Sequence, residues 1–349
     1  MNIKPTEKYD LFKISDSRAL ILGIATLWVA LFHSYDLNFE GSSLLVKLNL
    51  ATHLNLIKNI GNSGVDFFLF LSGFGLYYSM ERNRSLKHFY TRRFYRIVPE
   101  ILIVSFIYYG YIGATGFSDW LSQVFLYGFF IKGLNGGRYW YFALIIVLYI
   151  LYPLFHCIIK HWKLVGLIFL VALSISLSFI VRAIDLDYFN KIEIMLLRVP
   201  IFIIGIWFGQ KAYNHSSIPK WIIWCMLPLT VVSIIFSCRY QLPPGYDFLW
   251  RYKYIPMVVI MTLAISYLCA ISGENVLKRF LVVMGSFSLE MYLLYENMYL
   301  YLKGFFKISD KVGLTYAVAV FTEAFILSVA LYNINKLLLD KVFANTKSR

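Results

Sequence analysis

The chain has 349 residues, of which 59% are hydrophobic and only 15% are charged. Because soluble globular domains carry about 25% charged residues, this composition excludes an ordinary soluble protein. Lysine and arginine outnumber aspartate and glutamate by 33 to 19, an excess typical of membrane proteins, whose cytoplasmic loops face anionic lipid. No folded soluble domain is left to present a groove for nucleic acid. We therefore expect a protein that contacts membrane lipids and binds no nucleic acid.

Long apolar runs predict an all-α fold, a polytopic transmembrane helical bundle of about ten spans. A helical crossing needs about 20 apolar residues, and unbroken runs argue against a transmembrane β-barrel, whose strands alternate. The apolar stretch Trp120–Ile131 is too short to cross, so we expect an interfacial or re-entrant helix there. The expected spans are residues 18–36, 64–81, 97–116, 139–159, 163–181, 194–213, 219–238, 254–272, 280–302 and 313–336.

Loop charge predicts the orientation of these spans. Lysines and arginines precede the first span and follow every even-numbered one, whereas the long first outer loop holds only Lys47 and Lys58. By the positive-inside rule, both termini are then cytoplasmic. We interpret residues 1–349 as a single membrane domain, with a short cytoplasmic N-terminal segment at 1–17 and a cytoplasmic tail at 337–349.

Ionisable residues inside spans are costly and mark candidate functional sites. His33 lies near the outer end of the first span, with Asp36 about one helical turn further on. Asp66 begins the antiparallel second span at a similar depth. Histidine titrates near neutral pH, so His33 is a candidate general base, and Asp66 is the candidate carboxylate that orients its ring. Alternatively, His33 is an interfacial histidine bonded to its neighbours, and Asp66 complements a helix N-terminus.

A knot of cations follows the second span. Arg93 and Arg96 are three residues apart and share one helix face, and guanidinium groups bind phosphate in a bidentate manner. The knot therefore predicts a binding site for a cytoplasmic ligand that bears phosphate. Alternatively, its cations only fix the orientation of the spans in the membrane. Its six members lie within fifteen residues: Arg82, Arg84, Lys87, Arg92, Arg93 and Arg96.

Four further residues are candidates for substrate binding. Arg198 falls near the outer end of its span, where snorkelling to the interface would also explain it. Glu290 and Glu296 lie in the ninth expected span and would form a polar path or pair with arginines of the bundle. Trp140 belongs to the aromatic stretch LNGGRYWYF, which suits a sugar site and equally an interfacial aromatic belt.

Six segments, in this order, resemble the acyltransferase-3 family of integral membrane acyltransferases. The family includes O-antigen and other surface-polysaccharide O-acetylases. The resemblance covers nearly the whole chain but not the extracytoplasmic esterase-like domain that is commonly fused to family members. The matching segments are LGIATLWVALFH, GVDFFLFLSGFGLYYS, FYTRRFYRIVP, RYWYFALIIVLYILYPLF, LRVPIFIIGIWFG and MGSFSLEMYLLY.

The resemblance implies an O-acyltransferase, by analogy an O-acetyltransferase. It would move an acyl group from cytoplasmic acetyl-CoA, or another acyl-CoA, to a hydroxyl of an extracytoplasmic cell-surface glycan or glycolipid. His33 matches the family's essential first-span histidine. Arg93 and Arg96 match paired arginines thought to engage CoA, with Arg92 and Arg18 assisting. No metal is implied, and the expected location is the inner or plasma membrane of a bacterial-type cell.

Two positions depart from the family pattern. Leu22 stands where family members usually carry an arginine, eleven residues before the histidine. Arg18 lies one turn earlier on the same helix face, so its long side chain is a candidate substitute. Tyr295 stands where many relatives have histidine.

Two other functions are compatible with these residues. A transporter or flippase for a glycolipid or organic anion would use the same intramembrane charges as a relay, although the inverted repeats and broken helices of that class are not clear here. The other is a catalytically degenerate relative with a scaffolding role, which the departure at Leu22 favours. A homo-oligomer is also compatible with the sequence.

Overall fold

The computed structural model of the protein describes residues 11–35, 37–41, 43–112, 116–136, 139–218, 220–239, 247–306 and 313–347. Within these ranges every regular element is a helix and none is a strand, as the sequence predicts. In the described part of the chain, five segments are long and apolar enough to cross a membrane: Lys13–Phe32, Trp140–Ile184, Leu186–Tyr213, Asp247–Ile271 and Gly313–Val342. The protein is therefore an all-α bundle with membrane-spanning helices, and the count of ten spans stays a prediction.

The α-helices in chain order are α1 (Phe12–Phe32), α2 (Ser43–Lys47), α3 (Ala51–Asn59), α4 (Gly64–Arg82), α5 (Leu86–Ile112), α6 (Phe117–Val124), α7 (Tyr127–Lys132), α8 (Trp140–Ile184), α9 (Leu186–Leu196), α10 (Val199–Tyr213), α11 (Lys220–Arg239), α12 (Tyr254–Ile271), α13 (Val276–Ser286), α14 (Ser288–Phe306) and α15 (Gly313–Lys347). The short 3₁₀ helices are η1 (Phe39–Gly41), η2 (Ile60–Ser63), η3 (Gly133–Gly136) and η4 (Asp247–Lys253).

The structure differs in detail from the expected elements at four places. Helix α8 joins two expected spans, and Lys163, with φ of 50°, marks the kink between them. The expected span 280–302 is divided at Phe287 into α13 and α14. The stretch Trp120–Ile131 falls on α6 and α7, which have 8 and 6 residues and are each too short to cross a bilayer. Helix α15 continues through the expected tail to Lys347.

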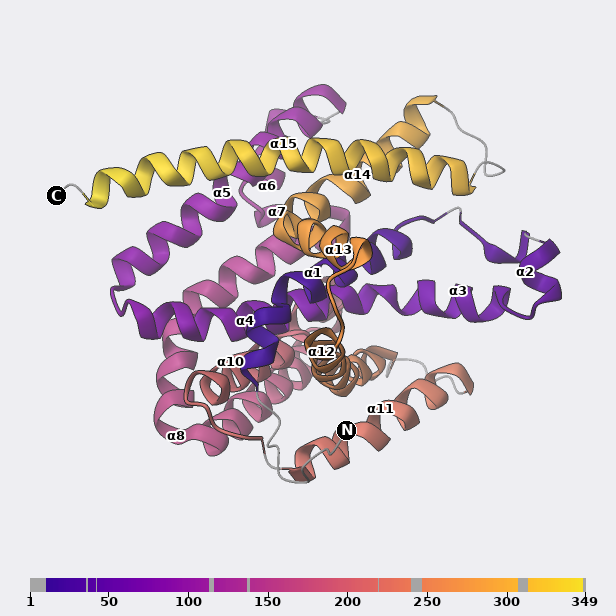
Figure 1. Cartoon of the computed structure of the whole chain (residues 1–349). Coiled ribbons are helices and arrows are strands. Elements are labelled where there is room, and N and C mark those ends of the chain that lie inside the picture. The colour runs from indigo at the N-terminus through magenta and orange to yellow at the C-terminus, as the bar shows by residue number, and fades with distance from the viewer. Residues whose placement is uncertain are drawn as a thin grey trace.

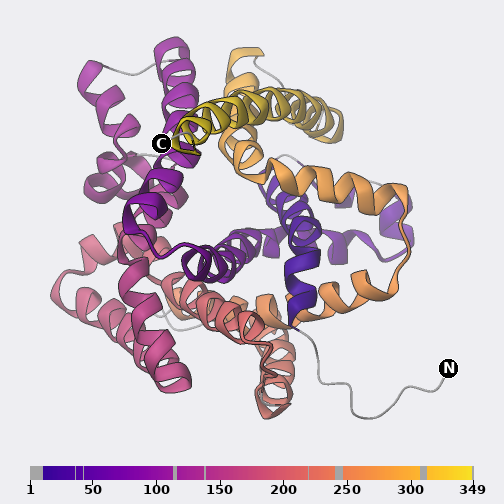
Figure 2. The same ribbon diagram turned by 60° about the vertical axis from the view of Figure 1, so that its left-hand side comes forward.

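Helix α1 lies at the centre of the bundle, where it packs against α4, α12, α13 and α14 (Figures 1 and 2). Helix α15, yellow in Figure 1, lies across α14 and α5. Helix α4 packs along α10, and a Cβ atom at Gly73 would collide with the backbone oxygen of Phe202. Small residues at such contacts let membrane helices approach backbone to backbone. This packing holds α1, α4 and α14 side by side around the residues discussed below.

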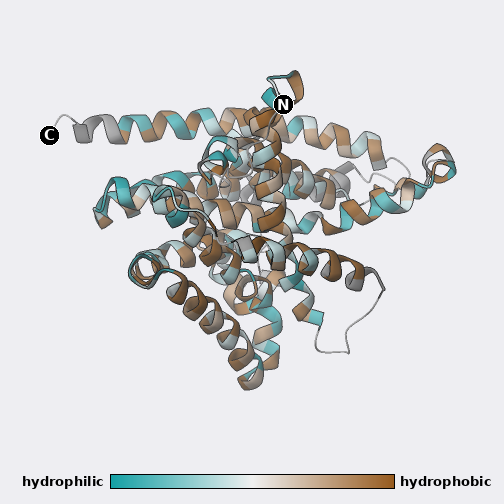
Figure 3. Cartoon of the chain, turned by 60° about the horizontal axis from the view of Figure 1, so that its bottom comes forward, coloured by the Kyte–Doolittle hydropathy of each residue, from teal (hydrophilic) through white to brown (hydrophobic). Residues whose placement is uncertain are grey.

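Large apolar side chains are exposed on the outer surfaces of α8, α11 and α15. Figure 3 shows apolar residues along most of the helices. A soluble protein rarely exposes a continuous apolar surface, so we interpret these surfaces as facing lipid. Examples are Ile150, Leu154, Ile168, Trp221, Trp224, Ile326 and Leu337.

Candidate active site

A cavity of about 610 Å³ lies between α1, α4, α5, α8 and the α13–α14 junction. Four arginines line it, Arg18 from α1 and Arg92, Arg93 and Arg96 from α5. The sequence predicts the last three as neighbours on one helix, but their convergence with Arg18 depends on α14, which packs against both α1 and α5. We call this space the arginine cavity. Its volume lies in the range of sites that hold small organic ligands.

Arg18 approaches the cavity next to a glycine of α4. A Cβ atom at Gly75 would lie 3.3 Å from the Arg18 guanidinium carbon, so the missing side chain leaves room for this cation. Leu22 lines the same cavity, as its spacing from Arg18 predicts. The charge that is missing at Leu22 is therefore present one turn away.

Arg93 carries a positive charge that no carboxylate neutralises within the described ranges. Its Nη2 donates a hydrogen bond to Oγ of Ser79 at 3.2 Å. Its guanidinium carbon lies 5.6 Å from the ring centres of Phe89 and Tyr149, a range in which cation–π attraction acts. These neutral partners hold the side chain in place and leave its charge available to an anion.

Arg96 has a different environment from Arg93. Its Nη1 donates to Oε1 of Glu100 at 2.6 Å and to Oε1 of Glu290 at 2.7 Å, and its Nη2 donates to Oε2 of Glu290 at 3.3 Å. Asn335 of α15 donates to Glu100 as well. Both carboxylate side chains are fully buried. Arg93 and Arg96, predicted together as a binding site for phosphate, thus both line the cavity but differ in their contacts, because Arg96 is already engaged by two carboxylates.

Glu290 consequently lies beside Arg96, without itself lining the arginine cavity. The sequence left open whether Glu290 belongs to a polar path or pairs with an arginine of the bundle, and the structure shows the pairing. Glu100 and Asn335 are absent from the sequence-based set of candidates. Glu100 follows Arg96 by four residues, a spacing that favours an ion pair on a helix, so this signal was present. Asn335 lies 239 residues from Arg96, and nothing local identifies it.

A second, much smaller cavity of about 10 Å³ surrounds His33. We call it the histidine chamber. Its lining holds one histidine, His33 at the end of α1, and one carboxylate, Glu296 of α14; the rest of the lining is Thr26, Val29, Ala30, Phe68, Met291, Tyr292 and Tyr295. The departure from the family pattern at Tyr295 thus falls in this chamber, where its hydroxyl bonds Oγ of Ser34 at 2.7 Å.

The backbone fixes the orientation and tautomer of His33. Its Nδ1 lies 2.9 Å from the backbone oxygen of Val29, and a carbonyl oxygen only accepts, so we assign the proton to Nδ1. In the neutral ring Nε2 then carries the lone pair. This atom lies 3.5 Å from Oε2 of Glu296. The imidazole is thus arranged to take up a proton at Nε2 beside a carboxylate.

Asp66 does not pair with His33, which corrects the sequence-based expectation. Its Oδ1 lies 3.4 Å from Nε of Arg198. Arg198 also donates to the backbone oxygens of Ile194 and Asn62 at 3.1 and 3.4 Å, and its guanidinium carbon lies 4.8 Å from the Trp140 ring centre. Three of the predicted site residues therefore form a separate buried cluster. Asp36 and Arg138 lie outside the described residues.

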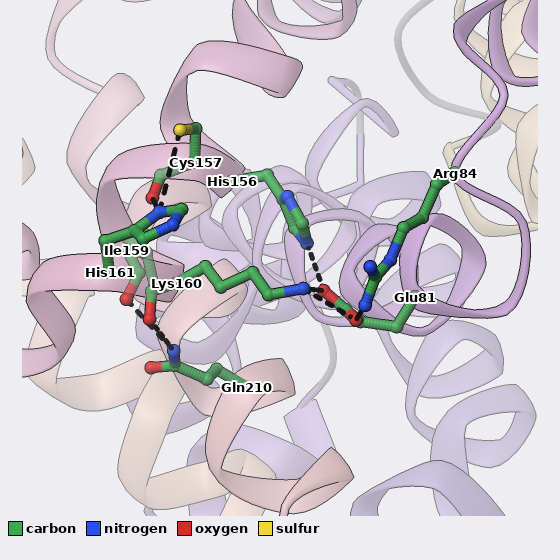
Figure 4. A network of polar contacts seen from close by, with 8 residues as sticks. All are labelled: Glu81, Arg84, His156, Cys157, Ile159, Lys160, His161 and Gln210. Carbon is green, nitrogen blue, oxygen red and sulfur yellow. Dashed lines mark hydrogen bonds and ion pairs between the residues drawn. The ribbon is translucent and has the colours of Figure 1, made fainter.

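Glu81, near the C-terminal end of α4, is the centre of a network of polar contacts (Figure 4). Its carboxylate accepts from Nζ of Lys160 at 2.7 and 3.0 Å and from Arg84 at 3.2 Å, and it lies 2.9 Å from Nε2 of His156. Gln210 of α10 donates to the backbone oxygen of Ile159 at 2.9 Å. Lys160 and His156 thus connect α8 with α4 through Glu81, and Arg84 of the predicted knot pairs with the same carboxylate and does not line the arginine cavity.

These features define an integral membrane protein whose helices enclose a basic cavity and a small chamber with a histidine. Residues 20–333 match the family model for the acyltransferase-3 domain, described as an acyltransferase domain. The chain belongs to this family, as the resemblance of its segments indicates, and the membership supports a membrane acyltransferase activity. No curated protein and no solved structure matches the chain.

Proposed function

We propose that the protein is an O-acyltransferase that moves an acyl group, in particular acetyl, from acyl-CoA to a hydroxyl of a cell-surface glycan or glycolipid. The observation that supports this proposal most is the order of the two cavities along α1. The last α1 residue to line the arginine cavity is Leu22, and the first to line the histidine chamber is Thr26. One helical turn, about 6 Å, separates them, so a donor and an acceptor held on either side would meet.

The arginine cavity is suited to the phosphates of CoA. Arg18, Arg92 and Arg93 face a cavity of about 610 Å³, and charge-assisted bonds from guanidinium groups to phosphate are among the strong hydrogen bonds of proteins. Arg96 contributes less in this proposal, because Glu100 and Glu290 already balance its charge. Its role is to position α5 against α14 and α15.

In the histidine chamber, His33 carries out the proton transfer of the reaction. Nε2 of His33 takes the proton of the acceptor hydroxyl while the hydroxyl oxygen attacks the thioester carbonyl. The carbon–oxygen bond forms, the carbon–sulfur bond breaks, and the imidazolium returns the proton to the sulfur of CoA. Glu296, 3.5 Å from Nε2, stabilises the charged ring, and the bond from Nδ1 to Val29 keeps the ring in place.

The proposed topology brings the two substrates to opposite ends of this path. Ten crossings with both termini in the cytoplasm would open the arginine cavity toward cytoplasmic acyl-CoA. The side chains of His33 and Glu296 keep 12% and 19% of their surface exposed, which leaves an approach for an acceptor from the other side. The corresponding location is the inner membrane of a bacterial-type cell, with a surface polysaccharide as the acceptor.

Consumption of acetyl-CoA by the purified protein tests the proposal. We expect wild-type protein to release CoA thiol, His33→Ala to lose at least 100-fold in turnover, and surface glycan from expressing cells to gain an acetyl-sized mass. His161→Ala is the matched control, because this exposed histidine of α8 bonds its own helix at Cys157. Full activity of His33→Ala would refute the role of His33 as the general base. No consumption and no glycan change would favour a transporter or an inactive relative.

A further inference from the structure

Two aromatic side chains form the wall between the arginine cavity and the histidine chamber. Among the residues that the structure describes, Phe68 of α4 and Tyr292 of α14 are the two that line both spaces. Their ring centres are 6.3 Å apart and their planes are nearly perpendicular, at 86°. Tyr141 of α8 reinforces the wall from the cavity side, 5.0 Å from Tyr292 and 6.2 Å from Phe68.

The spaces on the two sides of this wall differ greatly in size. The arginine cavity holds about 610 Å³, whereas the chamber holds about 10 Å³. A cavity needs about 10–15 Å³ on this measure to hold one water molecule. The chamber is at the lower end of this range, so it has no room for an acyl chain longer than the methyl of an acetyl group.

The lining of the chamber explains why a longer chain would not be admitted by small adjustments. Phe68 and Tyr292 are buried at 6% and 8% exposure, and Met291, which also lines the chamber, is buried at 1%. Packed interiors resist the insertion of additional methylenes, because neighbouring side chains are already in contact. The wall and the opposite lining thus act together as a limit on length.

We propose that Phe68 and Tyr292 determine acyl-chain length, restricting the donor to acetyl-CoA by closing the histidine chamber to longer acyl groups. This inference rests on the proposed function. The thioester carbonyl lies at the ring pair, with the sulfur on the side of the arginine cavity and the methyl in the chamber. The reaction is the transfer given above, with the carbon–sulfur bond exchanged for a carbon–oxygen bond and the hydroxyl proton delivered to the CoA sulfur.

The test compares acetyl-, propionyl- and butyryl-CoA with the purified full-length protein, by release of CoA thiol and by the affinity for CoA itself. One methylene in a tight apolar pocket changes kcat/KM by about 10- to 200-fold. We expect wild-type kcat/KM to fall at least tenfold with each added methylene. In Phe68→Ala and Tyr292→Ala, which join the two spaces, the ratio of acetyl-CoA to butyryl-CoA should fall to within about threefold of unity.

Phe70→Ala is the matched control. Phe70 is a fully buried ring of the same helix, paired edge-on with Phe208 at 5.2 Å, and it lines neither space. This variant should keep the wild-type order of donors. Phe68→Leu is the milder variant for the case in which Phe68→Ala does not fold, and it should accept propionyl-CoA better than wild type does.

The outcomes distinguish a failure of the acyl-length limit from a failure of the proposed O-acyltransferase activity. If the wild-type protein uses butyryl-CoA as well as acetyl-CoA, or if folded ring variants keep the wild-type order, the length limit is wrong while the acyltransferase proposal stands. If CoA binds to no variant and no thioester is consumed, the proposed function itself fails. Relaxed selectivity in the ring variants alone, with CoA affinity unchanged, supports the inference.

Discussion

Nε2 of His33 lies 3.5 Å from Oε2 of Glu296, across the interface between the C-terminal end of α1 and the middle of α14. Because Nδ1 donates to Val29, the carboxylate faces the ring nitrogen that gains and loses the proton. This differs from a triad in which the carboxylate binds the opposite nitrogen. Glu296 therefore stabilises the imidazolium directly, while the backbone orients the ring.

Replacement of Glu296 tests this relationship. In Glu296→Gln the imidazolium loses its counter-charge, and we expect kcat for acetyl-CoA consumption to fall about 10- to 100-fold, within the range of general acid–base contributions, with unchanged affinity for CoA. Glu323→Gln is the control, because Glu323 is an exposed glutamate of α15 that lines neither cavity. Equal kcat in Glu296→Gln and wild type would remove Glu296 from the mechanism.

Asp66 is expected to act on stability rather than on turnover. Asp66→Asn leaves Arg198, which is only 3% exposed, without its counter-ion. Breaking one side of a buried ion pair costs about 3–5 kcal/mol, so thermal unfolding in detergent should shift to lower temperature. The protein that remains folded should keep its kcat. A loss of kcat as large as that of His33→Ala, at an unchanged unfolding temperature, would return Asp66 to the catalytic set.

Arg93 and Arg96 should respond differently to the same substitution. Arg93→Ala removes a free cation, and we expect weaker CoA binding by about tenfold or more, since a hydrogen bond to a charged group contributes about 1.5–3 kcal/mol. Arg96→Ala leaves Glu100 and Glu290 buried together without a cation, so we expect a lower unfolding temperature. Arg82→Ala, an exposed arginine of the same knot, serves as the control in both measurements. Identical profiles for Arg93→Ala and Arg96→Ala would contradict this assignment.

Arg18 is expected to replace the arginine that family members carry at position 22. Arg18→Ala should weaken CoA binding, and addition of Leu22→Arg in the same chain should restore it, because both positions line the cavity on one face of α1. Calorimetric titration with CoA measures both variants. Rescue by Leu22→Arg is the informative result, since a purely structural role of Arg18 would not be restored from another position. Unchanged affinity in Arg18→Ala would exclude it from donor binding.

The sequence could predict how far along its span each site residue lies, but not which neighbouring helix its side chain faces. His33 and Asp66 were correctly expected near the same end of the first two spans, yet α4 presents Asp66 to α10 rather than to α1. Glu290 and Glu296 are six residues apart, so they differ by roughly 240° around α14 and by about 9 Å along it. Glu296 consequently lines the histidine chamber, whereas Glu290 pairs with Arg96 of the arginine cavity, and span prediction alone does not distinguish these positions.

The family resemblance and the arginine spacing were informative because they depend on local motifs. The long-range contacts have no such signal. Phe68 and Tyr292 are ordinary apolar residues in the sequence, and their position between two cavities results from the packing of α4 beside α14. The break at Phe287 was not predicted, because the apolar run continues through it, whereas the kink at Lys163 falls at the predicted boundary between the spans 139–159 and 163–181.

We propose that the arginine cavity binds the donor and that the histidine chamber, on the other side of the Phe68–Tyr292 ring pair, performs the transfer. Steady-state kinetics of acetyl-CoA consumption by wild type, Arg93→Ala and His33→Ala, measured in parallel, test it most directly. We expect a raised KM with a smaller change of kcat for Arg93→Ala, and a kcat lowered at least 100-fold at an unchanged KM for His33→Ala. Wild-type kcat in His33→Ala, or wild-type KM in Arg93→Ala, would contradict it.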